Sequence, residues 1–402
     1  MDSGSAPEPG RHVLRVHTPE DPVLLNTLTG DTLPSDSSRE SLSQSFFLRG
    51  QEEDALQRAL SRPEKTLSLT LINTWACNLR CSHCSVLDHL EETVTQRLDP
   101  ARLVGFVQRY LQARPGTEGI QVHFLGGEPL LAPESALHCL DALQGLAVPV
   151  RATVTTNGAV DTGDDVWALL RRLDRVHVSL DGDQASHDRQ RRFLTESASP
   201  HERTLGFLKE LVDNGLGDML HVQAAVTDKH TTASVRAQWY RDLIGAGVSV
   251  GQASFQSVHP TARNPRGGAA WRAGLASPRP RTRPCCRFRA STHWVVEPTG
   301  DLRPDFYRGP LLGTLETPVE ELFAQHTRHR ERTMPALSDP RCRACPVLGL
   351  CWGGCVQGEA LVGSTPSDHC DQQALMDHAE GLARRGDLAA LRGTRGCSAL
   401  ES

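Results

Sequence analysis

Short apolar runs alternate with longer amphipathic segments between residues 66 and 258. The apolar runs have the length and β-branched content of buried strands, and they cover 66–73, 120–129, 150–158, 175–182, 220–227 and 248–258. The intervening segments repeat apolar residues every three or four positions, as amphipathic helices do, at 99–113, 133–146, 164–173, 201–215 and 233–247. Asp99 and Pro100 are suited to begin the first of these helices, and Gly215 to close the fourth.

This alternation predicts an α/β fold. Strands that alternate with helices at this spacing form a parallel sheet with right-handed crossovers. We therefore expect a partial (β/α)6 TIM-like barrel, preceded by a small N-terminal module and followed by a cysteine-rich C-terminal domain. The expected boundaries are 1–65 for the module, 66–259 for the barrel, 260–284 for a linker, 285–380 for the cysteine-rich domain and 381–402 for a tail.

Composition narrows the class of protein. The chain has 402 residues, a formal net charge of −5 and arginines scattered among acids, so we expect neither a nucleic-acid nor a membrane surface. The first 22 residues contain no apolar stretch of signal-peptide length. We expect a cytoplasmic protein, in which the 12 cysteines are metal ligands or catalytic groups rather than disulfides.

Three of these cysteines follow the first predicted strand, in the stretch "ACNLRCSHCSV". Cys77, Cys81 and Cys84 have the spacing C-x3-C-x2-C, whereas structural zinc sites usually use four ligands in two close pairs. Three thiolates on one loop suit an iron–sulfur cube with one open iron. Further polar motifs also fall at predicted strand ends, where parallel α/β folds place their chemistry: "GGEP" at 126–129, "TTNG" at 155–158 and "SLDG" at 179–182.

With these motifs in this order, residues 67–258 resemble the radical S-adenosylmethionine (SAM) enzymes. The resemblance implies a [4Fe–4S] cluster on Cys77, Cys81 and Cys84, whose free iron binds SAM. One electron from the cluster would split SAM and produce a 5′-deoxyadenosyl radical that removes a hydrogen atom from a substrate. The resemblance also implies SAM-binding roles for Gly126, Gly127, Glu128, Pro129, Asn157, Ser179 and Asp181, and a family pattern continues at His187, Asp188 and Arg191.

A second group of cysteines lies near the C-terminus. The stretch "CRACPVLGLCWGGC" has spacings that do not suit a zinc ribbon, and it resembles the SPASM extension of radical SAM enzymes, which carries auxiliary iron–sulfur clusters. The resemblance implies one cluster on Cys342, Cys345, Cys351 and Cys370. It implies a second cluster on Cys355 with Cys286 or Cys285.

The family pattern is not followed at Asp305, where it expects a cysteine. The surrounding "GDLRPDFY" is also similar to a region of anaerobic sulfatase-maturating enzymes in which a cysteine precedes an aspartate base. Asp305 could be a cluster ligand, a catalytic base or part of a solvated turn, and the sequence leaves all three open.

The resemblance favours a peptide substrate. The layout of residues 23–81 is similar to that of maturases that modify ribosomally made peptides, in which the leading module helps to hold a leader peptide. We expect a thioether or carbon–carbon crosslink, or a related oxidation, with a reductant such as ferredoxin or flavodoxin as electron donor. The alternatives are formylglycine formation on a sulfatase and a non-catalytic iron–sulfur electron carrier. The module could also simply cap the barrel.

Overall fold

A computed structural model describes residues 8–61, 65–226, 232–257, 292–304, 306, 309–333, 339–351 and 372–386. The chain divides into two compact units. The described residues between 65 and 327 form one unit, and those of 8–61 form the other together with those after 327.

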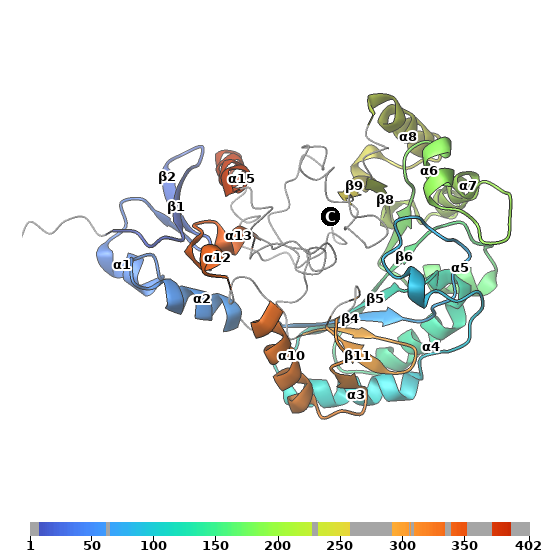
Figure 1. Cartoon of the computed structure of the whole chain (residues 1–402), viewed down its shortest axis with the longest axis horizontal. Helices are drawn as coiled ribbons and strands as arrows, with labels where there is room; N and C mark the ends of the chain where they lie inside the picture. The colour runs from blue at the N-terminus through green and yellow to red at the C-terminus, as the bar shows by residue number, and fades with distance from the viewer. Residues whose placement is uncertain are drawn as a thin grey trace, which may run out of the picture. The chain divides into compact units, whose positions relative to one another are not determined.

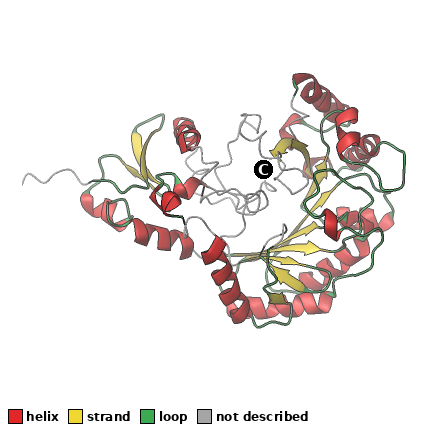
Figure 2. Cartoon of the chain, in the orientation of Figure 1, coloured by secondary structure: helices red, strands yellow, loops and turns green. Residues whose placement is uncertain are grey.

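The first unit is built on a nine-stranded sheet with the order β12-β11-β10-β4-β5-β6-β7-β8-β9. The six predicted strands are present and parallel: β4 (Thr66–Ile72), β5 (Gly119–Leu125), β6 (Val150–Thr156), β7 (Arg175–Ser179), β8 (Leu220–Val226) and β9 (Ala253–Ser257). Helices lie along one face of this curved sheet (Figures 1 and 2). They are α3 (Pro100–Ala113), α4 (Pro133–Gln144), α5 (Asp164–Leu170), α6 (Gln184–Gln190), α7 (Pro200–Asp213) and α8 (Ala233–Gly245).

Alternation along the strands positions the core. Leu67, Leu69 and Leu71 are fully buried in the large apolar cluster, because side chains two residues apart share a face. The predicted helix start is confirmed, since the Asp99 side chain accepts a hydrogen bond from the amide of Ala101 at 2.8 Å. The α/β barrel prediction is confirmed. Single 3₁₀ turns occur at η1 (Leu87–His89), η2 (Pro129–Leu131), η3 (Gly217–Met219) and η4 (Val250–Gln252).

Three further strands extend the sheet beyond β4, and the sequence pattern did not predict them. They are β10 (His293–Val296), β11 (Asp301–Arg303) and β12 (Gly313–Thr314), followed by α10 (Val319–Thr333). β10 runs parallel to β4, with His293 opposite Ser68, and Trp294 packs its buried ring edge-on against Phe106 of α3. Residues 292–327 therefore lie with the barrel, whereas the sequence-based division begins the cysteine-rich domain at 285.

The second unit is built from residues early in the chain and residues late in the chain. Its N-terminal part is the antiparallel sheet β1 (Val13–His17), β2 (Pro22–Asn26) and β3 (Thr32–Pro34), with α1 (Arg39–Gln44) and α2 (Glu52–Ser61). Its C-terminal part is α12 (Pro340–Ala344), α13 (Leu348–Cys351) and α15 (Gln372–Arg384). The predicted strand and turn at 23–33 are thus β2, the turn and β3. The five residues of β1 were missed because they lie within an otherwise polar, Pro-rich stretch.

One apolar core holds both parts of this second unit. Leu25 of β2 is fully buried in a cluster with Leu350 of α13 and Ala379 of α15. A side chain on Gly349 would lie 1.6 Å from the carbonyl oxygen of Thr27, so only glycine allows α13 to approach the β2–β3 turn this closely. The N-terminal module therefore packs directly on the segment that carries Cys342, Cys345 and Cys351.

Candidate active site

The loop after β4 carries the first three cysteines. Cys77 is buried, and Cys81 and Cys84 are half-buried. Cys77 shares a small apolar cluster with Leu79 and Phe193, and Cys81 packs against this cluster. The thiols therefore lie in surroundings that largely exclude water.

A short backbone ribbon holds this loop in place. Residues 78–82 run antiparallel to residues 190–194, which begin at the end of α6. The amide of Ser82 donates to the carbonyl oxygen of Gln190 at 2.8 Å, and Leu79 lies opposite Phe193. The sequence motifs did not reveal this pairing, because the two segments are more than 100 residues apart and each is too short to show a strand pattern.

The Gly-Gly-Glu-Pro loop after β5 lies against the cysteine loop. The amides of Gly127 and Glu128 donate to the carbonyl oxygens of Thr74 and Ala76, at 3.1 and 2.7 Å. A Cβ atom on Gly127 would lie 2.1 Å from the carbonyl oxygen of Ala76, and Gly126 has φ +143°. Both glycines are therefore required by the backbone, which must bring these two loops together without side chains between them.

The Glu128 carboxylate joins this loop to the end of β6. Oε1 accepts hydrogen bonds from the Thr156 hydroxyl at 2.7 Å and the Leu130 amide at 3.0 Å, and Oε2 accepts one from the Asn157 amide at 2.7 Å. Burial raises the pKa of Glu128 to about 7, against the effect of these donors. A carboxylate has about four acceptor positions, so this network leaves one for a further donor.

Asn157 is tied to the cysteine loop. Its Nδ2 donates to Oδ1 of Asn78 at 2.9 Å, and its Oδ1 accepts the amide of Ala159 at 2.8 Å. Asn78 in turn donates to the carbonyl oxygen of Ala159 at 2.6 Å. The Asn157 side chain therefore helps to set the position of the loop between the first two cysteines. The sequence motifs did not identify Asn78 as a residue of this site.

The end of β7 carries a buried ion pair. The Asp181 carboxylate accepts from Nε and Nη2 of Arg191, at 2.7 and 3.1 Å, and from the amide of Ala225 at 2.7 Å. Burial acts to raise the pKa of Asp181, but the positive groups around it, chiefly the Arg191 guanidinium, together outweigh burial and lower the pKa to about 2. Ser179 is half-buried as the last residue of β7, opposite Gln223.

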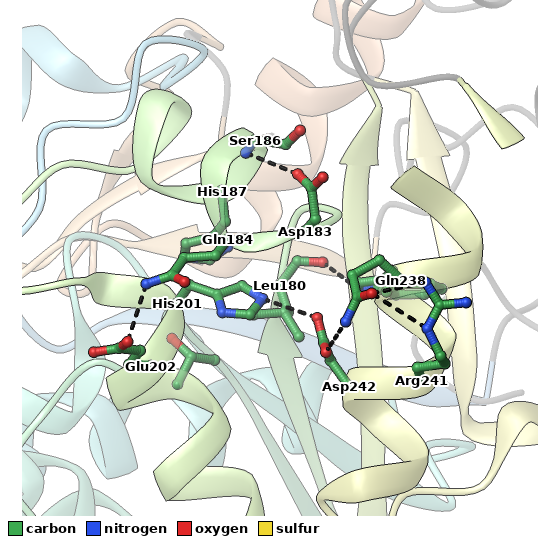
Figure 3. Close-up of polar contacts among 12 residues, drawn as sticks. Leu180, Asp183, Gln184, Ser186, His187, His201, Glu202, Gln238, Arg241 and Asp242 are labelled. Atoms are coloured by element: carbon green, nitrogen blue, oxygen red, sulfur yellow. Dashed lines mark hydrogen bonds and ion pairs between the residues drawn. The ribbon is translucent and has the colours of Figure 1, made fainter. Parts of the chain in front are cut away.

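A second set of contacts links α6 to α7 and α7 to α8 (Figure 3). The Nδ1 atom of His187 accepts the amide hydrogen of Asp181 at 2.9 Å, and burial lowers the pKa of His187 to about 3. The His187 ring packs edge-on against His201, whose Nε2 lies 3.5 Å from Asp242. Trp239 of α8 donates to the carbonyl oxygen of Leu180 at 2.8 Å. These contacts connect α6, α7 and α8 to the strand end that carries Asp181.

The cysteine environment suits a cationic cluster rather than free thiols. Burial raises the pKa of Cys77 to about 12 and that of Cys81 to about 11, so thiolates there need a strong positive partner. Among the residues that the structure describes, no three His, Cys, Asp or Glu side chains already converge on a single metal-ion position. An iron–sulfur cube does not need such convergence, because each cysteine binds a different iron atom.

Several other predicted site residues can be placed only in part. Pro129 begins η2, and its carbonyl oxygen accepts from Nδ2 of Asn73 at 3.0 Å. Cys342 and Cys345 are half-buried in the second unit, and Cys351 ends α13 there. The remaining predicted ligands lie outside the described residues, as does the predicted catalytic residue: Cys285, Cys286, Asp305, Cys355 and Cys370.

A protein-family model matches the part of the chain that carries this site. Residues 74–236 match the family model of the Radical SAM superfamily, and they include the cysteine loop, the Gly-Gly-Glu-Pro loop and the Asp181–Arg191 pair. The chain carries a radical SAM domain. The matched range includes the motifs expected to bind SAM, which lie at the ends of β4, β5, β6 and β7.

Two curated relatives are similar to part of this chain. A serine-type anaerobic sulfatase-maturating enzyme of Klebsiella aerogenes is 37% identical over 123 residues, which are 29% of this chain and 29% of the relative. The enzyme of the same description from Klebsiella pneumoniae is 36% identical over 123 residues, or 30% of its length. The similarity thus spans less than a third of these relatives.

Two solved structures share the fold over more of the chain. Native anSMEcpe with bound AdoMet and Cp18Cys peptide has a TM-score of 0.57 at 16% identity, covering 82% of this chain and 99% of that one. Streptococcus suis SuiB bound to precursor peptide SuiA has a TM-score of 0.54 at 13% identity, covering 90% of this chain and 98% of that one.

Across the described ranges, no helix has both the length and the apolar content of a membrane span.

Proposed function

We propose that this protein is a radical SAM enzyme that reductively cleaves SAM. The observation that carries the proposal is the close apposition of the cysteine loop and the Gly-Gly-Glu-Pro loop. Two backbone hydrogen bonds hold these loops together, and Gly127 allows a contact that no side chain would permit. A protein that used the three cysteines only as an electron-carrying scaffold would have no need for this second loop.

Cys77, Cys81 and Cys84 would hold a [4Fe–4S] cluster, with SAM on its fourth iron. When bound, this group supplies the electron that splits SAM into methionine and a 5′-deoxyadenosyl radical able to remove a hydrogen atom from a C–H bond. Glu128 keeps one acceptor position, in the rigid frame set by Thr156 and Asn157, for the SAM ammonium group. Leu79 and Phe193 exclude water around the thiolates, which limits loss of the radical to solvent.

The substrate we propose is a ribosomally made precursor peptide. SuiB has this kind of partner and shares the fold over 90% of the present chain. The anaerobic sulfatase maturases support a second candidate, formylglycine formation on a protein, through their 37% identity over 123 residues. In both cases the substrate is a polypeptide, and the electron donor would be a small reductant such as ferredoxin or flavodoxin.

The C-terminal cysteines would hold auxiliary clusters. Cys342, Cys345 and Cys351 lie on one short helical segment that is packed against the N-terminal sheet. With Cys370 they would complete one cluster, and Cys355 with Cys285 or Cys286 would contribute to another. Asp305 would be an oxygen ligand or a base for a proton that leaves the substrate.

The test uses anaerobically reconstituted full-length protein with SAM and dithionite. We expect 5′-deoxyadenosine by chromatography from the wild type and none from Cys77→Ala, Cys81→Ala or Cys84→Ala. Cys139→Ala is the matched control, because Cys139 is a buried cysteine on α4 outside the site. Equal product from the wild type and a triple variant of the three loop cysteines would contradict the proposal.

Candidate precursor peptides and sulfatase fragments can then be incubated with the active enzyme. A crosslink and a formylglycine made from Ser each lose two hydrogen atoms, so intact mass alone does not separate them. Hydrazide labelling of the formylglycine aldehyde and fragmentation by tandem mass spectrometry distinguish the two classes, because only a crosslink joins two residues. Modification of neither class, in an enzyme that cleaves SAM, would exclude both substrate proposals and leave SAM cleavage standing.

A further inference from the structure

The register of the backbone ribbon places Arg191 beside a predicted cluster ligand. The amide of Ser82 donates to the Gln190 carbonyl, and the amide of Arg80 donates to the Arg192 carbonyl, each at 2.8 Å. Arg191 is therefore the residue directly opposite Cys81. Directly opposite residues of an antiparallel pair project their side chains from the same face.

The Arg191 guanidinium is held in this position by Asp181. It is buried, and its Nε and Nη2 atoms donate to both carboxylate oxygens of Asp181. A guanidinium has five N–H donors, so this two-point contact leaves others available. Its positive charge acts on both thiols: burial raises the pKa of Cys81 and of Cys84, and the Arg191 guanidinium opposes this rise.

We propose that Arg191 is a positioning residue that donates a hydrogen bond to the Cys81 thiolate and, together with Asp181, sets the reduction potential of the cluster. This inference rests on the proposed radical SAM function. Hydrogen bonds and charges close to the sulfur ligands are among the main factors that set iron–sulfur potentials. Asp181 is thus given a role through Arg191, in addition to the SAM-binding role that the family resemblance implies.

The two charges should act in opposite directions. Reduction adds one negative charge to the cluster, so the guanidinium favours the reduced state and the carboxylate opposes it. Arg191→Gln removes the positive charge and leaves the buried Asp181 without its guanidinium partner, so we expect a lower potential. Asp181→Asn leaves the guanidinium uncompensated, so we expect a higher potential.

The experiment is a redox titration monitored by electron paramagnetic resonance. It uses full-length protein, reconstituted anaerobically, without SAM or substrate, and follows the [4Fe–4S]2+/1+ couple. The C-terminal cysteines are changed to alanine in every variant, so that only the first cluster contributes to the signal. The matched control is Arg192→Gln, because Arg192 carries the same charge one residue away and its side chain is exposed. We expect the control to keep the wild-type potential.

The outcomes separate the inference from the proposed function. If the parent protein assembles no [4Fe–4S] cluster on the first three cysteines, the proposed function is wrong. If the cluster assembles but Arg191→Gln and Arg192→Gln have the same potential, only the inference is overturned. Should Arg191→Gln fail to hold a cluster, Asp181→Asn and Arg191→Lys decide. The inference is overturned if Asp181→Asn has the wild-type reduction potential. It is also overturned if Arg191→Lys, which keeps the positive charge, lowers the potential as much as removal of that charge should.

Discussion

The two units of this protein bring their cysteines into place in different ways. In the barrel, Cys77, Cys81 and Cys84 lie on one loop that follows a central strand, and neighbouring strand ends supply the contacts around it. In the other unit, the segment with Cys342 and Cys345 packs on a sheet formed about 300 residues earlier in the chain. The first arrangement follows from the order of strands in a parallel sheet, and the second depends on long-range apolar packing.

This difference affects how the deletion of the N-terminal residues should be interpreted. Residues 8–61 could be regarded as a separable peptide-binding module on sequence grounds. They share an apolar core with α13 and α15, so their removal would expose Leu350 and Ala379 as well as remove any peptide contact. Loss of peptide binding in such a truncation would not by itself locate the peptide site, and single substitutions are better probes.

The largest effect should come from Gly127→Val. The new side chain would collide with the Ala76 carbonyl and force the Gly-Gly-Glu-Pro loop away from the cysteine loop. We expect loss of the iron bound by the first cluster, measured as iron and sulfide after anaerobic reconstitution, with hydrogen exchange in the second unit unchanged.

Gly206→Ala is the control for this variant, because Gly206 lies within α7 and nothing lies within 4 Å of an added Cβ atom. Full iron incorporation by Gly127→Val would show that the contact between the two loops is not needed for the cluster site.

Leu25→Ala should have an intermediate effect, confined to the second unit. Leu25 is fully buried between the N-terminal sheet and the C-terminal helices, and such truncations usually cost about 2–5 kcal/mol. Hydrogen-exchange mass spectrometry should show faster exchange in 8–61 and also in 339–351 and 372–386, while the barrel peptides keep their rates.

Leu33→Ala makes the same chemical change at a half-buried position and should cost less. Faster exchange in only one of the two segments would mean that they do not form one cooperative unit, and the contrast between the two cysteine sites would fail.

His187→Asn should have the smallest effect, seen only as a change in pH dependence. His187 has its pKa lowered to about 3 from 6.5, so the unfolded chain binds its proton more readily than the folded one. Its contribution to stability is present above pH 6.5 and is lost as the pH falls toward 3. Between pH 7 and 5 the loss is about 2 kcal/mol.

Asparagine can still accept the Asp181 amide hydrogen but does not titrate in this range. Denaturant unfolding of the barrel should therefore be about 2 kcal/mol less sensitive to this pH change in His187→Asn than in the wild type. Equal pH sensitivity in the two proteins would show that His187 is not kept neutral by its burial, and that α6 is less tightly held than the contacts in Figure 3 imply.

The sequence by itself determined the barrel and the location of its chemistry. Period-two and period-3.6 patterns are local signals that identify strands and helices. The C-terminal ends of parallel strands meet at one edge, so strand order alone brings together the motifs at Cys77, Gly127, Asn157 and Asp181. Composition and cysteine spacing then favoured an iron–sulfur cluster over zinc.

Only the tertiary structure decided how these residues are used. Three contacts join segments that are distant in sequence and show no hydrophobic pattern of their own. They are the pairing of 78–82 with 190–194, the ion pair of Asp181 with Arg191 and the packing of α13 on the β2–β3 turn. Strands β10 to β12 escaped prediction for the same reason, since a strand of two to four residues is too short to show a period. Such contacts form because buried polar groups need hydrogen-bond partners and apolar faces need other apolar faces to pack against. Which partner each group meets depends on the complete fold.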